Sequence, residues 1–206
     1  MNKKLVKYIV LIAVAGLLVY NSVYIKKPNT AISKFDKSKT DPTAFARLFW
    51  DSTFSKAIDS AITVEVFEKE FIEKGAQVTI EKYSHSQGVS SVAYMLQKFT
   101  GKVKEVTADK IVLKLTDSRS DHIVCNIGNY FGNGVRDATG LIKMGDFTNT
   151  MDYNMVSTEL NKIVKTEVIL PVKNKIKIND SLTVVGCVEI REGRLEEEIL
   201  PVKVIY

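Results

Sequence analysis

The spacing of hydrophobic residues along the chain changes near Val92. Before that point, apolar residues recur every three or four positions, and this spacing predicts an amphipathic helix from Pro42 to about Ser60. Asp41 directly before the proline supports that start, because a carboxylate caps free backbone N–H groups and proline is tolerated in a first turn. A second helix is predicted between Thr63 and Gly75. Residues 41–91 are therefore predicted to be a helical segment.

After Val92 the apolar period falls to two, which is typical of strands. Five strands are predicted, the first bent at Gly101, with one helix between the third and the fourth. In chain order these elements cover about 92–107, 110–115, 122–128, 148–164 for the helix, 181–190 and 196–206. This order is that of an OB-type barrel. Residues 92–206 are thus predicted to be an OB-like five-stranded β-barrel in an α+β protein, and an antiparallel sheet with a packed helix stays open as the alternative.

An uncharged apolar run lies close to the N-terminus. Tyr8 to Ile25 holds 18 residues without a charge, and a helix needs roughly 20 to cross a bilayer. A cleaved signal peptide is the alternative, since lysines followed by an apolar run fit both patterns. The small residues lie inside the run and not after it, which favours an uncleaved anchor. Residues 1–27 are predicted to be a cytoplasmic start and transmembrane signal anchor, followed by a tether at 28–40.

The cysteine and lysine positions bear on the kind of anchor and its orientation. A lipoprotein signal needs a cysteine directly after the apolar run, but the two cysteines are Cys125 and Cys187, both in strand-like runs. A membrane helix is expected in place of a lipid, and the two cysteines are expected to be buried thiols. Three lysines precede the span and two follow it, which favours a cytoplasmic N-terminus. The predicted location is the bacterial inner membrane, single-pass, with the C-terminal domain periplasmic or extracellular.

The formal net charge of +5 belongs to the N-terminal part of the chain. Five lysines lie in residues 1–27, whereas residues 28–206 hold 24 basic and 24 acidic residues. Binding to a phosphate backbone needs positive charge clustered on the folded surface. The membrane is therefore an expected partner, and nucleic acid is not.

Glycines and charged residues gather between Gly132 and Asn149. Loops on a rigid scaffold frequently carry function, so Arg136, Asp137, Asp146 and Asn149 are the candidate ligand-binding or partner-binding residues. Arg136 and Asp137 offer a guanidinium and a carboxylate to a ligand, but an internal ion pair is the more common use of such residues and is favoured. Asp146 is expected to cap the helix that follows.

No residue set in the sequence identifies a reaction. The run GNGVRD lacks the spacing of phosphate-binding glycine loops. The two histidines, His85 and His122, stand far apart, and the sequence has no HExxH, CxxC or GxSxG motif. We therefore expect no catalytic activity, no cofactor and no metal.

Three segments carry a resemblance to a known family: NSVYIKK, FWDSTFSKAIDSA and, most specifically, VRDATGLIKMGDFTNTMDYNMVSTELN. The sequence resembles the bacterial family of unknown function DUF2291. The resemblance implies a predicted periplasmic lipoprotein or membrane-anchored protein, often encoded beside ribose-type sugar ABC transporters, with no established activity. The family motif corresponds here to Gly132, Arg136, Asp137, Gly140, Ile142, Asp146, Phe147, Asn149 and Tyr153. This chain departs from it at Asn133, Gly134 and Thr150 and in lacking the lipid-bearing cysteine.

Two functions follow as the main expectations, beside a purely structural envelope protein without a ligand. The first is a membrane-anchored extracytoplasmic accessory or binding protein without catalytic activity, with sugar ABC transporter components as partners. The alternative is an envelope hydrolase acting on carbohydrate or peptide, with Asp137 and Asp146 as its acid and base. That alternative requires the two carboxylates to face one cleft.

Overall fold

The computed structural model describes residues 41–206 except 89 and 117. The predicted transmembrane anchor at 8–25 and the tether at 28–40 lie outside the described residues. Within the described part, no helix is both long and apolar enough to cross a bilayer.

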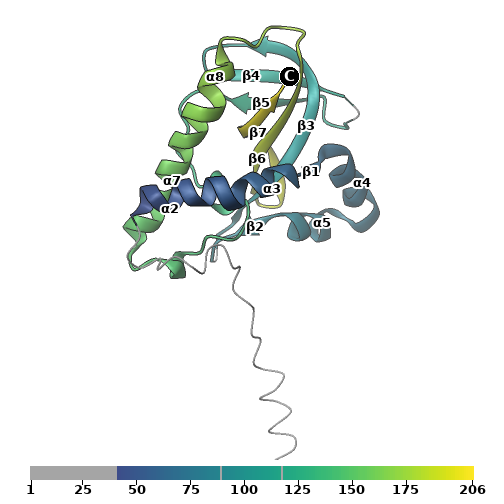
Figure 1. The fold of residues 1–206 in the computed structure, drawn as a ribbon. Helices are drawn as coiled ribbons and strands as arrows, with labels where there is room; N and C mark the ends of the chain where they lie inside the picture. The colour runs from purple at the N-terminus through teal and green to yellow at the C-terminus, as the bar shows by residue number, and fades with distance from the viewer. Residues whose placement is uncertain (1–40, 89, 117) are drawn as a thin grey trace, which may run out of the picture. The chain divides into compact units, whose positions relative to one another are not determined.

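Five long strands close into a barrel (Figure 1). They are β3 (Val92–Val106), β4 (Lys110–Leu115), β5 (His122–Asn126), β6 (Ser181–Arg191) and β7 (Arg194–Ile205). β3 pairs antiparallel with both β4 and β6, β4 pairs with β5, and β6 pairs with β7. A parallel pairing of β5 with β7 closes the ring. This is the OB arrangement that the element order predicted, and the open antiparallel sheet is wrong.

The long strand β3 pairs with two strands, β4 and β6, and a glycine allows β4 to come close to it. Gly101 stands where β4 begins to pair with β3, and a Cβ there would lie 2.4 Å from the carbonyl oxygen of Lys114. Only a residue without a side chain allows the two backbones to approach this closely. The turn between β6 and β7 places Glu192 and Gly193 at positive φ (51° and 75°).

Two two-residue strands extend this sheet, and the sequence pattern did not predict them. β1 (Ile62–Thr63) pairs parallel with β3, and β2 (His85–Ser86) pairs antiparallel with it. Segments this short have no measurable alternation of polar and apolar residues, so only their contact with β3 defines them.

The first predicted helix is present as one continuous helical stretch. It consists of α2 (Pro42–Phe49), a π-helical turn η1 (Trp50–Phe54) and α3 (Ser55–Asp59). The Asp41 carboxylate caps it by accepting a hydrogen bond from the backbone N–H of Ala44 at 3.1 Å. Trp50 is buried and stacks on Phe54, with ring centroids 5.1 Å apart. The only tryptophan therefore packs in the core.

A second pair of helices follows. α4 (Val64–Lys74) agrees with the predicted second helix, and the Thr63 hydroxyl accepts a hydrogen bond from Val66 N–H at its start. The structure adds α5 (Ala76–Tyr83), which was not predicted. Gly75 separates the two with φ of 88°.

The predicted helix between the third and fourth strands is longer than expected. It comprises α7 (Thr150–Ile163), the π-helical η3 (Val164–Ile169) and α8 (Leu170–Lys173). Two short elements precede it, namely α6 (Gly134–Asp137) and the 3₁₀ turn η2 (Met144–Asp146).

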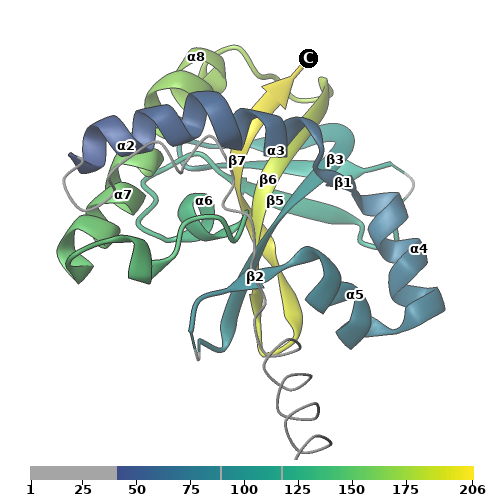
Figure 2. The same cartoon turned by 60° about the horizontal axis from the view of Figure 1, so that its bottom comes forward.

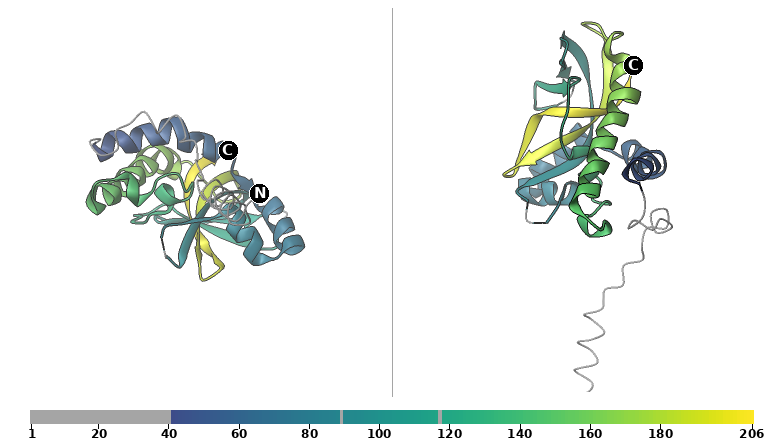
Figure 3. Two further views of the ribbon diagram at one scale, coloured as in Figure 1. Left: turned by 90° about the horizontal axis from the view of Figure 1, so that it is seen from below. Right: turned by 90° about the vertical axis from the view of Figure 1, so that its left-hand side faces the viewer.

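The helices lie on two sides of the barrel. α7 and α8 run along one side, whereas α4 and α5 lie on the other (Figure 2). α2 crosses α7 and packs against it (Figure 3). The barrel and both helical groups therefore bury their apolar faces on each other.

Candidate functional site

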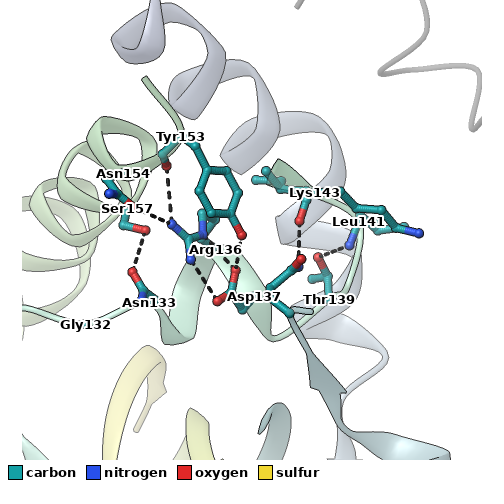
Figure 4. Close-up of polar contacts among 12 residues, drawn as sticks. Gly132, Asn133, Arg136, Asp137, Thr139, Leu141, Lys143, Tyr153, Asn154 and Ser157 are labelled. Atoms are coloured by element: carbon teal, nitrogen blue, oxygen red, sulfur yellow. Dashed lines mark hydrogen bonds and ion pairs between the residues drawn. The ribbon is translucent and has the colours of Figure 1, made fainter. Parts of the chain in front are cut away.

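Arg136 and Asp137 form an ion pair inside the protein, on the single turn of α6 (Figure 4). The guanidinium donates two parallel hydrogen bonds to the carboxylate, from Nε to Oδ1 at 2.7 Å and from Nη2 to Oδ2 at 2.9 Å. The two side chains are only 3% and 5% exposed. Bidentate pairing of this kind fixes both side chains in one orientation.

Helix α7 supplies the other partners of this pair. The Arg136 guanidinium lies over the Tyr153 ring, 3.6 Å from its centroid. Its Nη1 donates to the Tyr153 carbonyl oxygen at 3.3 Å and to Asn154 Oδ1 at 3.4 Å. Tyr153 in turn donates its hydroxyl to Asp137 Oδ1 at 3.3 Å, and burial raises its pKa to about 12. The tyrosine therefore stays protonated, and the network joins α6 to α7.

In the structure, the side chains of Arg136 and Asp137 thus form hydrogen bonds with each other and with residues of α7. The internal ion pair favoured from the sequence is confirmed. Direct contact of these two side chains with a ligand stays a prediction.

Asp146 and Asn149, the other two candidates, are local structural residues of the same connection. Asp146 Oδ2 accepts a hydrogen bond from the Lys143 backbone N–H at 3.1 Å and so stabilises η2. Asn149 caps α7, because its Oδ1 accepts from Asp152 N–H at 2.8 Å. The prediction that Asp146 caps this helix was wrong: the helix begins at Thr150, and the cap is the residue immediately before it.

A cleft of about 440 Å³ lies between the 128–133 loop and α7. Its volume is within the range of sites that hold small molecules. The exposed surface of its lining is mainly apolar, and amide, hydroxyl and ammonium groups are distributed over it beside two aromatic rings. The principal residues are Asn129, Tyr130, Phe131, Asn133, Asn154, Ser157, Thr158, Asn161, Lys162 and Lys165.

Asn161 holds an unused hydrogen-bond acceptor in this cleft. Its Nδ2 donates to the Gly132 carbonyl oxygen at 2.9 Å, which fixes the orientation of the amide. Its Oδ1 is buried and has no hydrogen-bond partner within the described part of the chain. A buried acceptor without a donor is costly.

Two further features complete the cleft. Phe131 is 93% exposed, so its ring is available to stack on an apolar ligand face. Ser157 donates its hydroxyl to Asn133 Oδ1 at 3.1 Å, which connects the loop to α7. The family segment that contains Arg136 and Asp137 thus positions one wall of the cleft, although neither side chain lines it.

Sequence reasoning missed this cleft, but a signal for it exists. Asn154, Ser157 and Asn161 stand at positions i, i+3 and i+7, which form one face of a helix. A polar stripe on an amphipathic helix is also what a solvated face looks like. It therefore indicates a binding site only when the position of the loop opposite the helix is known.

The two cysteines of the described part of the protein lie in barrel strands. Among the described residues, no three His, Cys, Asp or Glu side chains lie together in a way that would hold a metal ion. Cys125 on β5 and Cys187 on β6 are buried free thiols, as predicted. Burial raises the pKa of Cys125 to about 12 and that of Cys187 in the same direction. Both are therefore unreactive in the folded protein.

Comparisons with known proteins agree with the fold and the sequence motif. The model of the family described as "Predicted periplasmic lipoprotein (DUF2291)" matches residues 13–205. A crystal structure of an OB-fold protein from Thermotoga maritima is similar, with a TM-score of 0.69 and 23% sequence identity. The similarity covers 82% of this chain and 99% of that one. No curated protein matches the sequence.

Proposed function

Because the chain belongs to the DUF2291 family of predicted periplasmic lipoproteins, we propose that it is a membrane-anchored periplasmic binding protein. In this proposal the protein has no catalytic activity and serves a sugar ABC transporter as an accessory. The ligand is a carbohydrate held in the cleft between the 128–133 loop and α7.

The anchor in this proposal is the apolar segment 8–25 and not a lipid. The family description implies a lipid, but Cys125 and Cys187 are buried in barrel strands. Neither is placed to carry a lipid at a processed N-terminus. Sequencing the N-terminus of the membrane-extracted protein tests this: an intact start supports the helix, and a start at a lipid-modified residue overturns it.

The single observation that carries the proposed function is the buried, unpartnered Oδ1 of Asn161. Sugars present many hydroxyl donors and apolar ring faces. The cleft offers a buried acceptor, further amides such as Asn129 and Asn154, and the exposed ring of Phe131. A carbohydrate, which has both hydroxyl groups and apolar ring faces, therefore fits this lining.

The hydrolase alternative is less well supported by the position of Asp137. A catalytic acid or base must reach the substrate. Asp137 is 4% exposed, and its two oxygens accept hydrogen bonds from Arg136 and Tyr153. Asp146 meanwhile stabilises the η2 turn. These bonds favour binding over hydrolysis.

The test is calorimetric titration of the full-length protein in nanodiscs with pentoses and hexoses. We expect at least one sugar to bind, and Asn161→Ala to weaken that binding by about tenfold. Asn174→Ala, an exposed amide outside the cleft, should leave the affinity unchanged. Absence of binding by every sugar, or equal affinity in both variants, would contradict the proposal. Unchanged uptake of every pentose and hexose after deletion of the gene would end the transporter link.

A further inference from the structure

A second cavity, of about 350 Å³, lies on the other side of the barrel from the cleft described above. It is lined by residues of α4, of the strands β3, β4, β5, β6 and β7 and of the loop that follows β4. Figure 2 shows α4 on the side of the barrel away from α7. The cavity is therefore separate from the site proposed for carbohydrate.

The inner part of this cavity is apolar and aromatic. Its walls are hydrophobic side chains that the fold buries almost completely, so water gains few hydrogen bonds there. The principal ones are Val64, Phe67, Phe99, Ile123 and Val188, each no more than 5% exposed.

One polar side chain, Gln97, lines the cavity among these apolar groups. Gln97 is 1% exposed, and its Nε2 has no hydrogen-bond partner among the described residues. It lies on the same face of β3 as Met95 and Phe99, because side chains alternate along a strand. Directly opposite it on β6 is Gly186, which has no side chain to accept a hydrogen bond.

Hydrogen bonds between α4 and the loop that follows β4 lie at the entrance of the cavity, where Glu68 and Arg119 line it. The Glu68 carboxylate accepts hydrogen bonds from the Ser118 hydroxyl at 2.7 Å and from the Arg119 backbone N–H at 2.9 Å. Across the entrance, His122 Nε2 lies 3.9 Å from Glu197. Three carboxylates and one guanidinium line the opening, and this excess of negative charge disfavours an anionic ligand.

We propose that this cavity binds a small, uncharged and mainly apolar molecule with one carbonyl or hydroxyl oxygen, which accepts a hydrogen bond from Gln97 Nε2. The volume accommodates one or two rings. The aromatic and aliphatic walls bind the body of the molecule, and the single buried donor orients it. This site is independent of the carbohydrate cleft.

The experiment compares two probes of nearly the same shape that differ in the acceptor. 4′-Fluoroacetophenone carries a carbonyl oxygen, whereas 4-fluoroethylbenzene carries none. Binding of each to the full-length protein in nanodiscs is measured by fluorine NMR, with empty nanodiscs subtracted. The variant Gln97→Met removes the donor and keeps the volume of the side chain.

We expect both probes to bind the unaltered protein. Gln97→Met should weaken binding of the ketone by about tenfold and change binding of the hydrocarbon by less than twofold. Leu195→Trp, which fills the cavity from β7, should abolish binding of both. Thermal melting of each variant establishes that it is folded.

Three results would overturn the proposal. They are failure of both probes to bind the unaltered protein, equal effects of Gln97→Met on the two probes, and full binding by the Leu195→Trp variant. None of these results bears on the carbohydrate cleft, whose test uses different ligands and different variants.

Discussion

The backbone of Gly140 lies against the imidazole of His85, so that a Cβ at position 140 would come within 2.6 Å of His85 Nδ1. Gly140 also has φ of 64°, a conformation that residues with side chains rarely adopt. His85 belongs to the short strand β2, and Gly140 follows α6. The contact therefore connects the loop of the family motif to the edge of the barrel, and glycine is required there for two separate reasons.

Gly140→Ala should consequently destabilise the protein. We expect a loss of about 1–3 kcal/mol in the free energy of unfolding, from backbone strain and from the clash with the imidazole. Gly145→Ala is the matched control, since a Cβ at that position meets nothing within 4 Å. It should change stability by less than about 0.5 kcal/mol. Urea denaturation measures the free energy of unfolding of both variants. Equal losses in Gly140→Ala and Gly145→Ala would show that the contact between Gly140 and His85 does not contribute to stability.

The buried pair of Arg136 and Asp137 should respond very differently from an exposed pair. Arg136→Met leaves a carboxylate without its cation in the interior, which should cost about 3–5 kcal/mol. Arg191→Met removes a cation that is 58% exposed from its pairing with Glu189 and should cost at most about 1 kcal/mol. The double variant Arg136→Met with Asp137→Leu should recover much of the loss. If Arg136→Met is no less stable than Arg191→Met, the buried pair does not stabilise the fold.

Acid should weaken the contact between α4 and α5. The Lys82 ammonium, with Lys74 and Tyr83, lowers the pKa of Glu70 to about 2. A folded-state pKa below the unfolded value gives stability that is present above about pH 4.5 and is lost as the pH falls toward 2. Glu70→Gln should therefore be less stable than the unaltered protein at pH 6 and approach it near pH 2.

The control for this pH dependence is Glu73→Gln, on the exposed face of α4. Its carboxylate lies 4.0 Å from Lys69 Nζ, and both side chains are more than half exposed. We expect the urea midpoint of this variant to follow that of the unaltered protein at every pH. A constant offset between Glu70→Gln and the unaltered protein from pH 6 to pH 2 would argue against the ionised network.

Gln97→Met should make the unliganded protein more stable. A buried donor without an acceptor costs about 1–3 kcal/mol, and methionine fills the same space without that cost. Gln77→Met, on the exposed surface of α5, loses a hydrogen bond to Glu81 of 3.0 Å and should bring no gain. Thermal melting distinguishes the two. A lower melting temperature for Gln97→Met would mean that its amide is satisfied in solution.

The two thiols should react only when the barrel opens. Burial raises the pKa values of Cys125 and Cys187, and reaction with iodoacetamide requires an exposed thiolate. We expect no labelling in buffer within the lifetime of the folded state and labelling of both thiols in denaturant. Mass spectrometry after brief exposure measures this, and rapid labelling of either cysteine in buffer would contradict its burial.

The sequence by itself determined the local elements and their order. The change from helical to alternating spacing at Val92 and the cap at Asp41 both depend on neighbouring residues, so they could be predicted directly. Because three strands, a helix and two strands match few folds, this order also indicated the OB barrel. The short strands β1 and β2, the helix α5 and the closure of the barrel by the parallel pairing of β5 with β7 needed the structure.

Tertiary structure alone decided how the candidate residues are used. Arg136 and Asp137 were identified from the sequence, but their burial depends on Tyr153 of α7, a residue distant in the chain. The cavity beside Gln97 has no local signal in the sequence, and the polar stripe of α7 that includes Asn161 has the pattern of a solvated helix face as well. A hydrogen-bonding group is unpartnered only when every segment packed around it has been placed. Such a group therefore depends on long-range packing, which the spacing of apolar and polar residues along the sequence does not reveal.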